Sequence, residues 1–197
     1  MSTGTEALIT LDEFERLPDD EWRTELVRGR VVREPLNSMH QGWLASRVSL
    51  VVTDFVNLNG LGGVFMATGW VLREDPPTVR APHVAFLSRS RLPCAEESAS
   101  FGRMAPDLAV VIISPSNTSG EILDKVADYL DAGTRLVWVV EPSRERVIAY
   151  RSRNEIRLLQ DDDALDGFDV LPGFSVPVAE IFASSSGAGG TSSEVSR

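Results

Sequence analysis

The chain has 197 residues, 43% of them hydrophobic, which suits one domain with a sizeable core. It carries 29 Asp and Glu against 19 Lys and Arg, a formal net charge of -10, so nucleic-acid binding would need a local basic patch or bound metal ions. The single cysteine, Cys94, excludes an intrachain disulfide, and no apolar run reaches membrane-spanning or signal-peptide length. We therefore expect a cytoplasmic protein that does not bind membranes.

The N-terminal part predicts a short helix followed by a hairpin. Residues 1–9 are expected to be flexible. Thr10 and Glu13 form a capping-box pattern, which favours a helix starting there. Further along, the Arg28-Gly29 pair separates two short apolar runs and predicts a tight turn between two strands, over residues 25–33.

A longer helix and two strands come next. Apolar residues recur at helical spacing over residues 40–58, which predicts an amphipathic helix. Residues 64–72 and 79–87 are each predicted as a strand, and Pro82 makes the start of the second irregular or places it at a sheet edge. Residues 88–105 are polar and without periodicity, which is typical of a long loop.

The clearest pattern is a strand–helix–strand unit over residues 107–140. Residues 108–113 form a continuous apolar run, as expected of a strand buried on both faces. An amphipathic helix at 121–132 follows, and Gly133 is placed to end it in a left-handed conformation. Because a second apolar run lies at 135–140, we expect a parallel, right-handed βαβ crossover.

The C-terminal part completes a mixed α/β domain. Residues 146–151 and 155–159 predict a two-stranded meander, and 178–182 predict a last short helix. The Ser- and Gly-rich residues 184–197 are expected to be a disordered tail. We therefore predict one domain over residues 10–183.

Few residues have the chemistry of an active site. No nucleophile elbow, phosphate-binding glycine loop or zinc-ligand spacing is present. The only lysine is Lys125, in the predicted helix of the βαβ unit; either the position requires an ammonium group or an Arg-rich composition left one Lys by chance. Together with Glu25, His83 and Asp107, which lie near predicted strand ends, it resembles the residue set of metal-dependent phosphodiester cleavage, where carboxylates hold Mg²⁺ and a lysine orients the attacking water.

Several segments in order resemble the Uma family of restriction endonucleases, a branch of the PD-(D/E)XK nuclease superfamily. The resemblance covers residues 10–183. It implies a restriction-endonuclease-like central mixed β-sheet flanked by helices, a DNA substrate and Mg²⁺ as cofactor. The segments are TELVRGRVVREP, MHQGWLASRV, TVRAPHVAFL, PDLAVVIISPSNT, DKVADYLDAGTRLVWVVEP and VLPGFSVPVAEIFA.

The resemblance also assigns roles to individual residues. Lys125 matches the family's catalytic lysine, Glu25 an early acid, and His40 a histidine at the start of the long helix. His83 stands where the family has its first metal-binding Asp, and Val111 where it has a metal-binding Glu. The lysine is therefore present, while both central metal carboxylates are replaced.

Three of these positions have alternative explanations. His83 is either a ligand for Mn²⁺ or another transition metal, or a hydrogen-bonded histidine at a strand end. Val111 contributes no ligand and packs well in a buried strand. Asp107 follows Pro106 as in the family's Pro-Asp pair but precedes the wrong strand, so it is a weak metal candidate and more simply a residue at a strand start.

Three functions follow from these residues. The chain is an endonuclease if another acid or metal replaces the missing ligands, with Mg²⁺, Mn²⁺ or no metal bound. Alternatively it is a catalytically inactive binding or interaction module, expected to be a homodimer, or a structural remnant. The net charge and the replaced acids favour an impaired or lost nuclease activity.

Overall fold

The structure is a computed structural model that describes residues 8–18, 23–94 and 100–183. The predictions of a flexible N-terminus before residue 8 and of a disordered tail from residue 184 lie outside the described residues. The helices are α1 (Leu11–Glu15), α2 (Met39–Asn59), α3 (Ser119–Asp131) and α4 (Val178–Phe182). The strands are β1 (Arg23–Val27), β2 (Arg30–Glu34), β3 (Gly62–Met66), β4 (Trp70–Arg73), β5 (Thr78–Arg80), β6 (Val84–Ser88), β7 (Leu108–Ile112), β8 (Leu136–Glu141), β9 (Arg146–Tyr150), β10 (Ile156–Gln160), β11 (Ala164–Asp166) and β12 (Ser175–Pro177).

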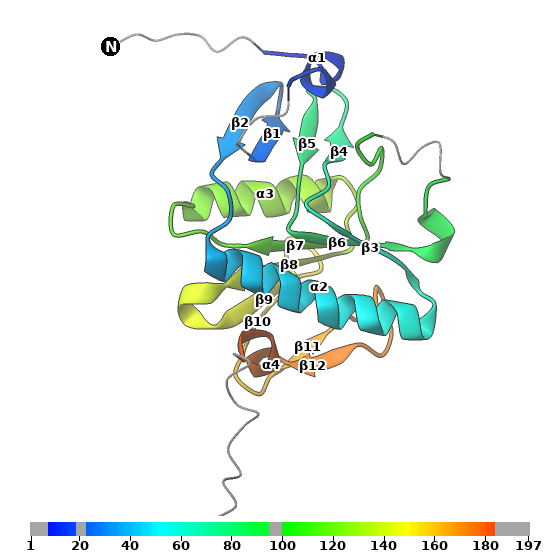
Figure 1. Cartoon of the computed structure of the whole chain (residues 1–197), viewed down its shortest axis with the longest axis vertical. Coiled ribbons are helices and arrows are strands. Elements are labelled where there is room, and N and C mark those ends of the chain that lie inside the picture. Colours follow the sequence, from blue (N-terminus) through cyan, green and yellow to red (C-terminus); the bar gives the residue numbers. More distant parts are fainter. Residues whose placement is uncertain (1–7, 19–22, 95–99, 184–197) are drawn as a thin grey trace, which may run out of the picture.

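A six-stranded sheet forms the centre of the molecule, with the strand order β10-β9-β8-β7-β6-β3 (Figure 1). β7 and β8 are parallel and joined through α3, whereas the other neighbouring strands are antiparallel. All residues of β7 and β8 are buried, as expected for strands covered on both faces. The predicted central mixed sheet flanked by helices and the βαβ unit are both confirmed.

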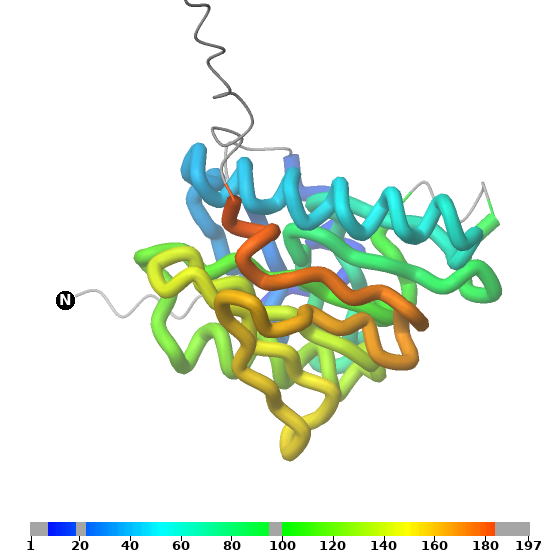
Figure 2. The backbone as a smooth tube through the Cα atoms, turned by 90° about the horizontal axis from the view of Figure 1, so that it is seen from below, coloured from blue at the N-terminus to red at the C-terminus, as the bar shows by residue number. Residues whose placement is uncertain are grey.

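Helices cover the two faces of this sheet in different ways. α2 and α4 pack on one face around Trp138 and Phe174, and the C-terminal segment runs beside α2 (Figure 2). α3 covers the other face with Ile122, Val126 and Tyr129. Alternate side chains of β7 and β8 therefore pack into two separate apolar cores, one on each face of the sheet.

A second sheet of four strands, ordered β2-β1-β5-β4, lies on the far side of α3 (Figure 1). The prediction of one strand over residues 64–72 and of another over 79–87 is wrong in each case, because each segment divides between the two sheets. The first breaks after β3 at Ala67, which has φ 48°. The second breaks at the Ala81–His83 segment, where Pro82 carries no N–H for a ladder.

The predicted hairpin is confirmed as β1–β2, with Val27 paired to Arg30. Arg28 and Gly29 both have positive φ, 51° and 79°, as a tight two-residue hairpin turn requires. This turn fixes the pairing along the hairpin, so that Arg23 and Glu34 lie opposite one another at its far end.

The C-terminal region contains a short hairpin, β11–β12, that the sequence pattern did not predict, before the predicted last helix, α4. Among the helices of the described residues, none has both the length and the apolar character needed to cross a bilayer.

Candidate functional site

α3 lies between the two sheets and presents a different face to each. Its apolar residues pack on the six-stranded sheet. Lys125 and Asp128, three residues apart and therefore on one side of the helix, pair with residues of the four-stranded sheet. The helix thus carries charged groups into the space between the sheets.

Glu25, in the middle of β1, is the centre of this charged cluster and has no exposed surface. Its Oε1 accepts a hydrogen bond from the Ala81 N–H at 2.8 Å and lies 2.9 Å from the Lys125 ammonium. Its Oε2 accepts from Arg80 Nη1 at 2.9 Å. Both carboxylate oxygens are therefore fully engaged.

Arg80, in β5, joins Glu25 to Asp128. Its Nε and Nη2 donate to Asp128 Oδ2 at 2.9 and 2.6 Å, while Nη1 donates to Glu25. Burial alone would raise the pKa of Glu25, but Lys125, Arg80 and Arg23 lower it to about 2. Glu25 is thus a carboxylate at neutral pH, balanced by buried cations.

A second carboxylate, that of Glu34 at the end of β2, also reaches the lysine. Its Oε1 accepts from Lys125 Nζ at 3.0 Å, and its Oε2 lies 3.8 Å from Arg23 Nη1. The side chain is 24% exposed, whereas that of Lys125 is 5% exposed. Lys125 is therefore held between one deeply buried carboxylate and one near the surface.

His83, immediately before β6, is buried and hydrogen-bonded. Its Nδ1 accepts the Ile112 N–H at 3.1 Å, so the ring hydrogen lies on Nε2, which donates to Asn37 Oδ1 at 3.1 Å. Burial, with Arg23 and Lys125 nearby, lowers the pKa of His83 to about 2. The ring is neutral, and both of its nitrogens are engaged.

Val111, in β7, is 2% exposed and packs against α3. Its side chain has no donor or acceptor atom. It lies in the wall of a cavity of about 360 Å³ that is also lined by His83, Arg80, Glu34 and Lys125. His83 and Val111, the two positions that the resemblance matched to metal-binding acids, therefore line one cavity together with the lysine.

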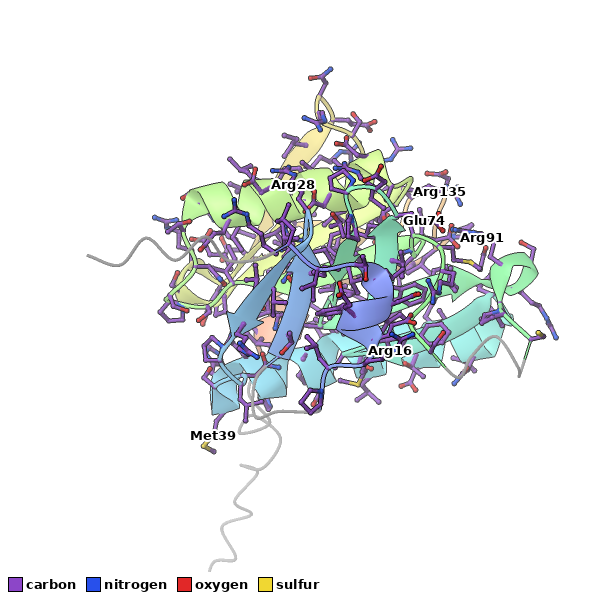
Figure 3. All side chains as sticks on the ribbon, turned by 90° about the horizontal axis from the view of Figure 1, so that it is seen from above. Arg16, Arg28, Met39, Glu74, Arg91 and Arg135 are labelled. Carbon is purple, nitrogen blue, oxygen red and sulfur yellow. The ribbon has the colours of Figure 1, made fainter. Side chains whose placement is uncertain are left out.

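Asp107 and His40 do not line this cavity. Asp107 precedes the opposite end of β7 from Ile112; its carboxylate accepts the Ser88 N–H at 2.8 Å and Arg91 Nη1 at 2.6 Å. In Figure 3, Arg91 and Arg135, which both approach Asp107, lie on one side of the molecule, far from Met39 at the start of α2. His40 is exposed on the first turn of α2, with its ring stacked on Trp43.

Sequence reasoning missed four members of the cluster: Arg23, Glu34, Arg80 and Asp128. Two of them had a readable signal. Asp128 is three residues after Lys125 on the same helix, and Glu34 lies opposite Arg23 once the Arg28-Gly29 turn sets the hairpin register. Figure 3 shows Arg28, at that turn, beside the α3 ribbon, and its Nη2 lies 4.0 Å from Asp128 Oδ1.

The residues around the cavity do not fit a divalent metal ion. Mg²⁺ needs several free oxygen ligands in near-octahedral geometry, but the oxygens of Glu25 are taken by Lys125, Arg80 and the Ala81 N–H. His83 offers no free lone pair, since Nδ1 accepts from Ile112 and Nε2 carries the hydrogen. Within residues 8–18, 23–94 and 100–183, no three His, Cys, Asp or Glu side chains form a group that could hold a metal.

Comparisons with known proteins agree with this fold. The sequence model of the Uma2 family, described as "Putative restriction endonuclease", matches residues 11–179. A crystal structure of a protein from Anabaena variabilis ATCC 29413, titled a putative nuclease belonging to DUF820, superposes with a TM-score of 0.80 at 22% sequence identity, covering 88% of this chain and 97% of that one. No curated protein matches the chain. Restriction-endonuclease-like families generally use a divalent metal ion. The match over residues 11–179 shows that this chain belongs to the Uma2 family of restriction-endonuclease-like proteins.

Proposed function

We propose that this chain is a restriction-endonuclease-like protein that has lost metal-dependent DNA cleavage and acts as a binding module. The observation that carries the proposal is the cavity at Lys125, whose wall has His83 and Val111 at the two positions that we match to the family's metal-binding acids. Losing partners of metal ligands already lowers metal affinity or activity about 10–100-fold, and losing two ligands should lower it further.

The state of the lysine supports the same proposal. In metal-dependent phosphodiester cleavage a lysine must face the attacking water or the phosphate. Here Lys125 Nζ lies 2.9 Å from Glu25 Oε1 and 3.0 Å from Glu34 Oε1. Two carboxylates hold the ammonium in a pocket wall, and the part of the chain that the structure describes offers no group of metal ligands beside it to activate water.

A second candidate is an active endonuclease that uses a different acid, and Glu34 is the observation that favours it. This carboxylate lies at the cavity, is partly exposed and contacts the lysine. If it turned toward a bound Mg²⁺ or Mn²⁺, Glu34 would provide a carboxylate ligand next to the lysine.

Cleavage of supercoiled plasmid DNA with Mg²⁺ or Mn²⁺ separates the two candidates. We compare four chains: the unmodified chain, the double variant His83→Asp/Val111→Glu, and each of these with Lys125→Gln added. Each variant is first checked for cooperative unfolding. We expect no cutting by the unmodified chain and lysine-dependent cutting by the double variant. Robust cutting by the unmodified chain that Lys125→Gln abolishes would overturn the proposal.

If neither the unmodified chain nor the double variant cuts DNA, measurements of metal binding and of DNA binding decide between the two candidate functions. Calorimetric titration with Mg²⁺ and Mn²⁺ should show no site in the unmodified chain. A gel shift with duplex DNA in EDTA then tests the DNA partner that the family suggests. DNA binding without metal binding would support the binding module, and a metal site abolished by Glu34→Gln would favour the second candidate.

We further propose that the module is a homodimer. β10 is an edge strand of the six-stranded sheet, and Ile156 and Leu158 on it are each 50% exposed. Such an edge supports pairing with a second copy of the chain. Sedimentation of the unmodified chain and of Leu158→Lys tests this: we expect a dimer that the substitution dissociates, and a monomeric unmodified chain would contradict it.

A further inference from the structure

Arg23, at the start of β1, is a partly buried cation whose hydrogen-bonding groups are largely unused. Its side chain is 14% exposed. Nη1 lies 3.2 Å from His83 Nε2, but that nitrogen carries its own hydrogen and cannot accept. Nε and Nη2 are buried, and neither has a hydrogen-bond partner among the residues that the structure describes. Leaving such donors unsatisfied is unfavourable, so the site around Arg23 lacks an acceptor.

The space beside Arg23 joins the cavity at Lys125. A small cavity of about 20 Å³ is lined by Arg23, and six of its lining residues also line the larger cavity of about 360 Å³. These six are Glu34, Pro35, His83, Ile112, Ser116 and Asn117. A group that enters the larger cavity between Lys125 and Arg23 would therefore have both cations and the Ser116 hydroxyl nearby.

Glu34 is the anion that stands between these cations. Its Oε1 is 3.0 Å from Lys125 Nζ, and its Oε2 is 3.8 Å from Arg23 Nη1, too long for a direct hydrogen bond. Glu34 ends β2 and is 24% exposed, whereas Glu25 has no exposed surface. Of the two carboxylates on Lys125, only Glu34 can turn to solvent without leaving a charge buried.

We propose that Lys125 and Arg23 form a metal-independent binding site for a phosphate group, and that the Glu34 carboxylate occupies this site until a phosphate displaces it. A guanidinium binds phosphate oxygens through its N–H groups. Nη1 of Arg23 faces the Glu34 carboxylate, and Nε and Nη2 are further donors that have no partner among the described residues. The ammonium of Lys125 supplies the second positive charge. This inference rests on the proposed function, because it requires that no metal ion takes part. It adds the class of ligand, a phosphate group, that the same cavity binds.

Calorimetric titration in EDTA tests the site, with inorganic phosphate and with dimethyl phosphate as probes. Glu34→Gln removes the competing charge and keeps the side-chain shape, so we expect phosphate affinity to rise about tenfold. Glu121→Gln is the matched control: it makes the same change of net charge at the cavity rim, but Glu121 pairs with the Thr118 N–H instead of the cations. Arg23→Gln in the Glu34→Gln background should abolish the gain.

The outcomes decide both the site and its source of phosphate. Equal affinities of Glu34→Gln and Glu121→Gln, or a gain that survives Arg23→Gln in a chain that still unfolds cooperatively, would overturn the inference. Binding of dimethyl phosphate points to the phosphodiester backbone of a nucleic acid, and binding of inorganic phosphate alone points to a phosphate monoester. Because EDTA is present throughout, this result is independent of plasmid cleavage, which tests the proposed function.

Discussion

Two buried carboxylates, Glu25 and Asp107, differ in how exposed their cationic partners are. Their side chains are 0% and 2% exposed. Glu25 is paired with Arg80 and Lys125, which are themselves only 7% and 5% exposed. Asp107 pairs with Arg91, which is 35% exposed, and accepts the backbone N–H of Ser88. One carboxylate is paired with two buried cations, and the other fixes a loop to a strand start.

This difference separates a candidate site from a structural contact. Burying charges on both partners carries a desolvation penalty that their attraction often fails to recover, so a buried cluster is a poor device for stability alone. The cluster around Glu25 also borders a cavity of about 360 Å³. Asp107 does not line that cavity. Its partners are the Ser88 N–H and a partly exposed arginine, Arg91.

The largest expected effect comes from breaking the buried cluster at Arg80. Arg80→Met removes the cation shared by Glu25 and Asp128 and leaves their charges buried and under-compensated. We expect the free energy of unfolding to fall by about 3–5 kcal/mol. Urea denaturation followed by circular dichroism measures it.

Arg30→Met provides the control, because it makes the same chemical change on an exposed residue of the β1–β2 hairpin. We expect a change within about 0.5 kcal/mol. A loss below about 1 kcal/mol for Arg80→Met would mean that Lys125 alone compensates Glu25, and the contrast with Asp107 would be weaker than the geometry indicates.

His83 gives the cluster a pH dependence that begins near pH 6.5, whereas the lowered pKa of Asp107 acts only in the acidic range of a carboxyl group. The pKa of His83 is lowered by burial, Arg23 and Lys125 from 6.5 to about 2, so in this range the unfolded chain binds more protons than the folded one. The free energy of unfolding therefore falls as pH falls below 6.5, by about 1.4 kcal/mol per unit, or about 2 kcal/mol at pH 5. Glu25, with its pKa lowered from 4.5 to about 2, adds to this loss only below about pH 4.5.

His83→Gln isolates this contribution, because an amide oxygen can accept the Ile112 N–H without titrating. We expect the fall in unfolding free energy between pH 6.5 and pH 5 to be about 2 kcal/mol smaller in the variant. An unchanged pH profile would show that His83 is protonated in the folded chain and that the cavity is more polar than its contacts imply.

The sequence predicted the βαβ unit, because that unit depends on short-range patterns and one helix face. It placed Lys125 and Glu25 in one candidate set without predicting the ion pair between them. The resemblance singled out His83 and Val111, and both line one cavity. Arg80 could not be found in this way. Its contacts depend on how two sheets pack around α3, which no local spacing encodes.

The two wrongly predicted strands have a related cause. Residues 64–72 and 79–87 each continue an apolar pattern across a break, and the pattern does not reveal that the two halves join different sheets. That change of sheet places Arg80 in β5 and His83 just before β6. The same error therefore hid the position of the site's central arginine.

A smaller effect is expected at the other carboxylate. Asp107→Asn keeps an oxygen that accepts the Ser88 N–H and removes only the charge that faces Arg91. Because charge-assisted hydrogen bonds are about twice as strong as neutral ones, we expect a loss of about 1 kcal/mol by urea denaturation. Glu25→Gln is the matched comparison. It should lower the free energy of unfolding by more than Asp107→Asn does, because two buried cations, Arg80 and Lys125, then lose a carboxylate partner. Equal losses would remove the distinction between the two carboxylates.

The smallest effect is expected for Arg91→Gln, which removes the partly exposed cation from Asp107. The remaining Ser88 N–H and the nearby Arg135 still stabilise the carboxylate, so we expect a loss of less than about 1 kcal/mol. Salt screens partly exposed charges more than buried ones, so this loss should shrink between low and high NaCl, whereas the loss in Arg80→Met should persist. Urea denaturation of both variants at the two salt concentrations measures this. A salt-independent loss at Arg91 as large as that at Arg80 would mean that the Asp107 end is as dry as the cavity, and that exposure does not distinguish the two carboxylates.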